Sequence, residues 1–141
     1  MELVSAKKSF LKTTRSFGKF LPVIFGVLLL VSLILTIIPR EFYSKIFTDN
    51  IILDPLLGAV VGSISVGNPL VSYIIGGELT AEGVGLMAVT AFILSWISVG
   101  VFQIPAEAAA LGKRFTIMRN VFSFVTALVI AVLVYFTISV I

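Results

Sequence analysis

The stretch IILDPLLGAVVGSISVGNPLVSYIIGG, residues 51–77, decides the fold of this chain. Asp54-Pro55 pairs a helix-capping residue with a proline in the first turn, which predicts that a helix begins there. A second start signal follows at Gly67-Asn68-Pro69, because Pro69 disfavours helical geometry at Asn68 and Gly67 tolerates turn conformations. The stretch therefore predicts two short helices joined by a turn.

The composition of the whole chain indicates that its solvent is a lipid bilayer. Hydrophobic residues make up 59% of the 141 residues and charged residues only 12%, with a mean hydropathy of +1.18. Soluble domains carry about 25% charged residues. The basic residues cluster at the ends of apolar runs, where they orient membrane proteins, so we do not expect nucleic-acid binding. We predict a small all-α integral membrane protein.

Three apolar runs are long enough to cross that bilayer. Residues 21–39, 83–104 and 120–141 contain no charged side chain, and each is close to the ~20 residues that a ~30 Å hydrocarbon core requires. Residues 1–20 form a basic arm ahead of the first span. The apolar run of that span is too long for a cleaved signal peptide. We expect the arm to be cytoplasmic and to touch anionic headgroups, and residues 21–141 to form one membrane domain.

The charges choose between a continuous span and a hairpin at 51–77. Two crossings there would need about 40 residues, and a single crossing would place the basic link 105–119 outside, against the positive-inside rule. A re-entrant hairpin that enters and leaves on the outer face puts eight Lys/Arg inside and two, Arg40 and Lys45, outside. We therefore predict three transmembrane helices plus a re-entrant helical hairpin, with the N-terminus cytoplasmic.

Enzymatic chemistry finds little support in this sequence. There is no cysteine and no histidine, which removes disulfides, thiolate and imidazole metal ligands, and the usual catalytic base. The run Gly62–Gly67 is not a nucleophile elbow, and no strand precedes Gly83-x-Gly85 as a dinucleotide site requires. We predict no enzyme, no catalytic residue, no metal and no cofactor.

The run from Gly62 to Asn120 resembles the small predicted permeases of bacteria and archaea, half-length relatives of larger permeases that include organoarsenical exporters. The resemblance is carried by the turn before Tyr73, by Gly83 and Gly85 ahead of a helix with Trp96, and by the link IPAEAAALGKRF at 104–115. It implies a permease or channel-like subunit in a prokaryotic cytoplasmic membrane, of which two copies complete a pathway. A thiol-based metalloid site cannot be carried over, because the chain has no cysteine.

The turn at Gly67-Asn68-Pro69 is the candidate solute site. Broken helices in lipid are tolerated only where protein or a water-filled cavity satisfies the freed backbone groups. If Asn68 caps the second helix, the positive end of that helix lies near the midplane, which makes an anion a candidate solute. Hydroxyl groups from Ser63, Ser65, Ser72 and Tyr73 lie close in sequence. The alternative is a packing turn whose polar atoms satisfy one another.

Three charged residues, Asp54, Glu107 and Arg114, are candidates for gating or ion coupling. For Asp54 the expected role is a helix cap at the outer interface, and ion coupling is the alternative. Glu107 follows Pro105 and would favour the start of a short helix that ends at Gly112, and Arg114 is within reach as a partner for its carboxylate. Either role is consistent with the sequence.

Small residues predict close helix packing. They recur at helical spacing as Ala88, Ala91, Ser95 and Ser98 in one span, as Ser123, Ala127 and Ala131 in the last, and as Gly58-x-x-x-Gly62 in the hairpin. Their number leaves surface for contacts between protomers, so we expect a parallel homodimer or higher homo-oligomer. The competing function is an accessory or assembly subunit without a transport pathway of its own.

Overall fold

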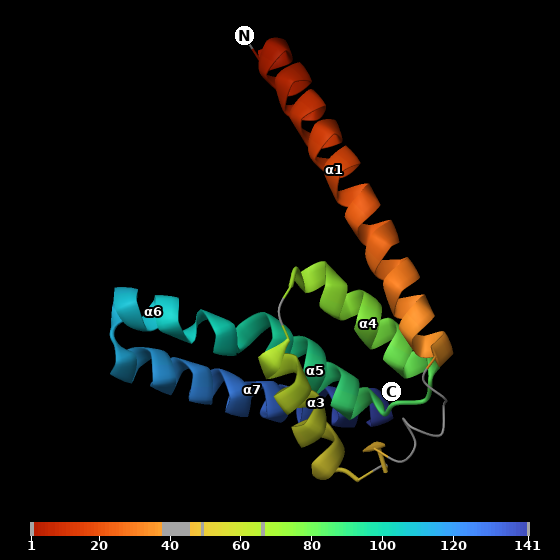
Figure 1. Ribbon diagram of the computed structural model, residues 1–141, viewed down its shortest axis with the longest axis vertical. Coiled ribbons are helices and arrows are strands. Elements are labelled where there is room, and N and C mark those ends of the chain that lie inside the picture. Colours follow the sequence, from red (N-terminus) through yellow and green to blue (C-terminus); the bar gives the residue numbers. More distant parts are fainter. Residues whose placement is uncertain (1, 38–45, 49, 66, 141) are drawn as a thin grey trace. The chain divides into compact units, whose positions relative to one another are not determined.

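The computed structural model describes residues 2–37, 46–48, 50–65 and 67–140, and in these residues every regular element is a helix (Figure 1). The elements are α1 (Glu2–Ile37), α3 (Leu53–Ile64), α4 (Pro69–Ala81), α5 (Leu86–Ser98), the 3₁₀ helix η1 (Val101–Gln103), α6 (Ile104–Leu111) and α7 (Lys113–Val140). The all-α prediction is confirmed. Within the same residues, three segments are long and apolar enough to cross a membrane, namely Ser9–Leu33, Leu86–Leu111 and Lys113–Val140.

The chain forms two compact units, Met1–Ile38 and Pro39–Ile141. The first unit is helix α1, in which the basic arm and the apolar run form one 36-residue helix with Pro22 inside it. The end of the expected first span, and the two basic residues Arg40 and Lys45, lie outside the described residues.

Helix α5 is the centre of the second unit, and glycines bring α3 against its backbone. A Cβ atom added to Gly58 would lie 2.2 Å from the carbonyl oxygen of Ala88, and one added to Gly62 would lie 2.3 Å from that of Phe92. A step of four residues along α3 thus matches a step of four along α5, so the two helices run parallel. The expected close approach at Gly58-x-x-x-Gly62 is confirmed, and it is made between two helices of the same chain.

Helix α4 runs back along α5 in the opposite direction. The turn before α4 lies at Trp96 near the end of α5, where a Cβ atom on Gly67 would be 3.1 Å from the indole ring. Further along α4, Gly76 packs against Ile93, and Leu79 packs on the cluster of Val84, Ala88 and Val89 near the start of α5. α3 and α4 therefore both pack on α5, with the turn between them near the end of α5 (Figure 1).

Helix α7 covers α5 and α3 with the small residues of its apolar run. Ala131 is fully buried in a cluster with Ala59, Met87 and Ala91, and Phe124, Leu128 and Val132 pack around it. The small faces expected in the last two spans are thus largely occupied by contacts inside the chain: Ala88, Ala91, Ser95, Ala127 and Ala131 are all buried.

The structure differs from the expected span 83–104, which is not one helix. α5 ends at Ser98, Val99 is extended and Gly100 is non-helical, and the chain then continues through η1 into α6. The span-length segment Leu86–Leu111 therefore contains an interruption. Neither a proline nor a charged residue marks the break, so Gly100 is the only local sign in the sequence that the helix ends there. The last helix also begins earlier than expected, at Lys113. The expected span was defined by its lack of charge, and the first two turns of this helix carry Lys113, Arg114 and Arg119.

Candidate functional site

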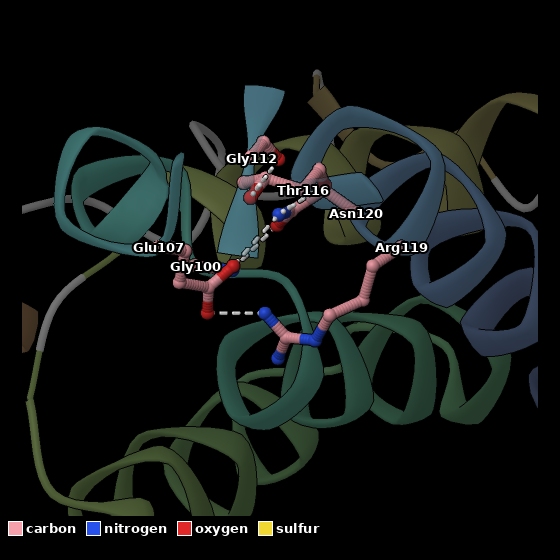
Figure 2. A network of polar contacts seen from close by, with 6 residues as sticks. All are labelled: Gly100, Glu107, Gly112, Thr116, Arg119 and Asn120. Carbon is pink, nitrogen blue, oxygen red and sulfur yellow. Dashed lines mark hydrogen bonds and ion pairs between the residues drawn. The ribbon is translucent and has the colours of Figure 1, made fainter. Parts of the chain in front are cut away.

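A polar network holds the interruption between α5 and α6, and its centre is the side chain of Asn120 in α7 (Figure 2). The Oδ1 atom of Asn120 accepts a hydrogen bond of 3.1 Å from the backbone N–H of Gly100. The Nδ2 atom donates to the carbonyl oxygen of Thr116 at 3.0 Å and lies 3.4 Å from Oε2 of Glu107. Asn120 is only 7% exposed, so one buried amide joins three segments of chain.

An ion pair extends this network toward the surface. The guanidinium of Arg119 donates to Oε1 of Glu107, so both carboxylate oxygens face donors from α7 (Figure 2). The Glu107 side chain is 18% exposed and the Arg119 side chain 38%. The pair is therefore half-buried, and its stabilising effect is on the order of the 1 kcal/mol typical of partly solvated pairs.

Local sequence signals explain why α6 and α7 meet in this way. Pro105 lies in the first turn of α6, where its missing N–H has no helical partner to lose. Gly112 has a φ of +89°, a conformation that side chains rarely adopt, and it reverses the chain between the two helices. Thr116 then bonds back to the carbonyl oxygen of Gly112 through its backbone N–H and its hydroxyl.

The expectation for Glu107 holds in part. Glu107 lies in the first turn of a short helix that ends before Gly112, as predicted. The predicted pairing with Arg114 is wrong, because the carboxylate of Glu107 binds Arg119 instead. The reversal at Gly112 lays α6 antiparallel to α7, which brings the second turn of α7 opposite Glu107, while Arg114 is exposed.

Asp54 does not cap its helix, which corrects the predicted role. α3 begins at Leu53, and Oδ1 of Asn50 accepts from the backbone N–H groups of Ile52 and Leu53 at 3.0 and 3.2 Å. Asp54 lies in the first turn, is 4% exposed, and accepts a hydrogen bond of 3.2 Å from the backbone N–H of Thr48. It borders a small cavity of about 180 Å³ together with Asn50, Leu86 and Tyr135.

The turn at Gly67-Asn68-Pro69 has the predicted local structure. Oδ1 of Asn68 accepts from the N–H of Leu70 at 3.0 Å, and Pro69 is the first residue of α4, so the predicted cap is confirmed. All three residues of the turn are exposed, as is Tyr73. Three serine hydroxyls nearby, on Ser63, Ser65 and Ser72, donate to carbonyl groups about one helical turn before them.

The turn between α3 and α4 and the break between α5 and α6 are the two helix interruptions, and they lie near each other. Nε1 of Trp96, three residues before Val99, makes a long contact of 3.5 Å with the carbonyl oxygen of Gly67. α3 also contacts η1 directly. The end of α5 therefore brings together the turn before α4 and the polar network around Asn120.

The network has the chemistry to bind a polar group, since it combines a carboxylate, a guanidinium and an amide beside the C-terminal end of α5. The predicted site residues did not include Gly100, Thr116, Arg119 and Asn120, all members of this network. The sequence does contain one signal for Asn120, because it is a lone amide at the start of the uncharged run 120–141. By its position alone it is only the first residue of an expected span. Within the described residues, no three acidic side chains gather as a metal site.

Comparison of the chain with known protein families, with curated proteins and with solved structures finds no match. The resemblance to small permeases therefore stays a prediction.

Proposed function

We propose that this chain is a subunit of a homo-oligomeric permease or channel-like protein that moves a small solute across a prokaryotic cytoplasmic membrane. The observation that carries the proposal is the network of Glu107 and Asn120 at an interruption between apolar helices. Charged and polar side chains are costly at membrane depth and are typical of solute pathways. Interrupted helices in membranes are likewise found where protein or a cavity satisfies the backbone.

In the proposed topology, α1, α5–α6 and α7 cross the membrane, with the N-terminus and the turn at Gly112 in the cytoplasm. The 12-residue α3 and the 13-residue α4 rise about 18 and 20 Å, less than the ~30 Å of a hydrocarbon core. Asn50 before α3 and Leu86 at the start of α5 border one cavity, which is consistent with a common outer end. The turn at Trp96 lies about 15 Å along α5 from Leu86, near mid-depth for a re-entrant pair.

The pathway proposed here passes the end of α5, where the two interruptions lie side by side. An anion is the candidate solute, because the N-terminus of α4 offers backbone donors beside Asn68 and carries the positive end of the helix dipole. Glu107 and Arg119 are the proposed gating or coupling pair, since their contact joins α6 to α7.

One observation favours the alternative function, an accessory or assembly subunit without a pathway. The polar side chains around Asn68 bond within their own helices, as a packing turn requires. Such a subunit would have no transport activity by itself.

Reconstitution of the purified protein distinguishes the two functions. Vesicles with and without protein are exposed to hyperosmotic glycerol, urea, potassium chloride, potassium nitrate or potassium acetate, and light scattering reports solute entry. The permease proposal requires faster entry of at least one of these solutes with protein, and a changed rate in Glu107→Gln at matched incorporation. Glu78→Gln, which removes a carboxylate from α4, is the matched control. Folded protein that admits none of these solutes supports the accessory role.

Chemical cross-linking in native membranes tests the oligomer. The proposal expects a discrete dimer or higher species with parallel protomers, because eight basic residues inside against two outside oppose insertion in both orientations. A monomer that transports when diluted would contradict it.

A further inference from the structure

An open groove runs along α7, and it meets the network around Asn120 at Arg119. Its volume is about 1020 Å³, at the upper end of the ~300–1,000 Å³ of small-molecule sites. One wall is the face of α7 from Met118 to Ile130, and the other includes Leu94 and Ser98 of α5.

The two ends of this groove differ in chemistry. Lys113, Arg114 and Arg119 line one end, while the rest of the lining is mainly apolar, with Phe122 and Ile130 among its members. Arg119 is neutralised by Glu107, but in the described part of the chain neither Lys113 nor Arg114 has a carboxylate partner. The groove is therefore amphipathic, with two uncompensated positive charges at its polar end.

From this pattern we propose that the groove binds one anionic phospholipid of the cytoplasmic leaflet, with the phosphate at Lys113 and Arg114 and an acyl chain along α7. The apolar part from Arg119 to Ile130 is about 16 Å long, which is long enough to hold much of an acyl chain. Basic pockets between transmembrane helices on the cytoplasmic side are typical sites for anionic headgroups. The inference rests on the proposed membrane placement and is independent of transport.

Charge complementarity separates a lipid from the other candidates for this groove. A parallel second copy would bring its own Lys113 and Arg114 to the same end. Helix α1 would bring Arg15 and Lys19, the basic residues nearest its apolar run. Both would place like charges together, whereas a phosphate is attracted to this end.

Native mass spectrometry of the purified protein measures the preference directly. Phosphatidylglycerol and phosphatidylcholine with identical acyl chains are added in equal amounts, and we expect the anionic lipid to bind at least about tenfold more tightly. Lys113→Gln with Arg114→Gln should bring the two lipids within about twofold of each other. Arg40→Gln with Lys45→Gln removes the same charge from the predicted outer side of the membrane and should leave the preference unchanged.

A second pair of variants tests the apolar wall. Thr126 lines the groove and Val125 does not, although both are exposed on α7. Thr126→Trp should fill the groove and weaken binding of phosphatidylglycerol at least fivefold, while Val125→Trp should not. Both substitutions add similar bulk to the same turn of helix, so a general effect on folding would appear in both.

Several results would overturn the lipid proposal. These are equal binding of the two lipids by the parent protein, an equal loss of preference in the Arg40/Lys45 variant, and full competition by glycerol phosphate, which would indicate an anion site. Dissociation of an oligomer by Thr126→Trp with an unchanged lipid preference would make the groove a protomer interface. Alkaline extraction separates the premises: release of the parent protein from membranes refutes the membrane placement, whereas retention without a lipid preference refutes only the groove.

Discussion

The side chain of Asn120 accepts a hydrogen bond of 3.1 Å from the backbone N–H of Gly100, twenty positions earlier in the chain. That contact replaces a helical bond which Gly100 lacks because α5 has ended at Ser98. An interruption inside an apolar segment is thus stabilised by one amide from the neighbouring helix. The relationship gives the first prediction.

Asn120→Leu keeps approximate size but removes the partner of Gly100 and one donor to Glu107. We expect the free energy of unfolding to fall by about 1–3 kcal/mol, because a buried backbone N–H and a carboxylate oxygen lose their partners. The measurement is the thermal unfolding midpoint in detergent. Thr126→Val is the control, since its hydroxyl bonds only to Phe122 in its own helix. An Asn120→Leu variant at least as stable as the parent would show that the network contributes nothing to the fold.

The pair Glu107 and Arg119 gives a second prediction, best read from a double-mutant cycle. Glu107→Gln and Arg119→Gln, made singly and together, should show a coupling of about 0.5–1 kcal/mol that weakens at high salt, since the pair is half-buried. The same cycle with Arg114→Gln in place of Arg119→Gln should give a coupling near zero. Coupling of Glu107 to Arg114 rather than to Arg119 would contradict the observed pairing.

The contacts of Asn120 with Gly100 and of Glu107 with Arg119 could not be predicted from the sequence. Glu107 was placed correctly in a short helix because Pro105 and Gly112 are local signals. Its partner depends on how α6 folds back on α7, which no local signal encodes, and the sequence alone favours Arg114 because it is nearer along the chain. Gly100 and Asn120 were missed for the same reason: the break is stabilised by a residue from another helix.

The fold was more predictable where the signals were local. Asn68 and Pro69 start α4 as expected, because a cap and a first-turn proline act within three residues. Asp54 looked like a similar cap, but α3 begins one residue earlier at Leu53 and has no side-chain cap, while Oδ1 of Asn50 accepts from the N–H groups of Ile52 and Leu53 just before it. The re-entrant path of α3 and α4 depends on the bilayer, and it stays a prediction.

The third prediction concerns the packing of α3 on α5. Gly58→Ala places a Cβ atom 2.2 Å from the backbone carbonyl oxygen of Ala88, and neither backbone can move easily. We expect a loss of about 1–3 kcal/mol in the free energy of unfolding. Gly77→Ala is the matched control in α4, where an added Cβ meets nothing within 4 Å, so the change should be neutral or stabilising by up to about 1 kcal/mol. Equal stability of the two alanine variants would refute the close approach.

The fourth prediction is the topology, and the absence of native cysteine makes it simple to test. Single cysteines at Thr48 and Thr80 should react with a membrane-impermeant thiol reagent from outside, and one at Ala110 only after permeabilisation. All three positions are exposed, so protection reports the bilayer and not the fold. Protection of position 80 together with outside labelling of position 110 would replace the re-entrant pair by a continuous crossing.

The last prediction tests whether the turn at Gly67-Asn68-Pro69 binds the solute. Asn68 has two separable features: Oδ1 caps α4 by accepting from Leu70, and the amide is exposed to any ligand at that helix end. Asn68→Leu removes both, so we expect solute binding to fall by at least about 1.4 kcal/mol, a factor of ten, in protein that still inserts. Asn68→Ser keeps a capping oxygen but loses the amide donors, and it should reproduce most of the loss if the amide touches solute.

Pro69→Ala should have a milder effect than either variant, because the cap at Asn68 still starts α4. Binding is measured as the stabilisation of the thermal midpoint by the solute that proves active in the vesicle assay, since a ligand of the native state raises apparent stability by mass action. Asn68→Ser that binds like the parent, beside a weakened Asn68→Leu, would assign Asn68 to capping alone. If Asn68→Leu itself inserts, assembles and binds like the parent, the turn only packs α3 and α4 on α5. The solute site would then lie at the other interruption, among Glu107, Arg119 and Asn120, where the polar groups come from different helices and can separate when the helices move.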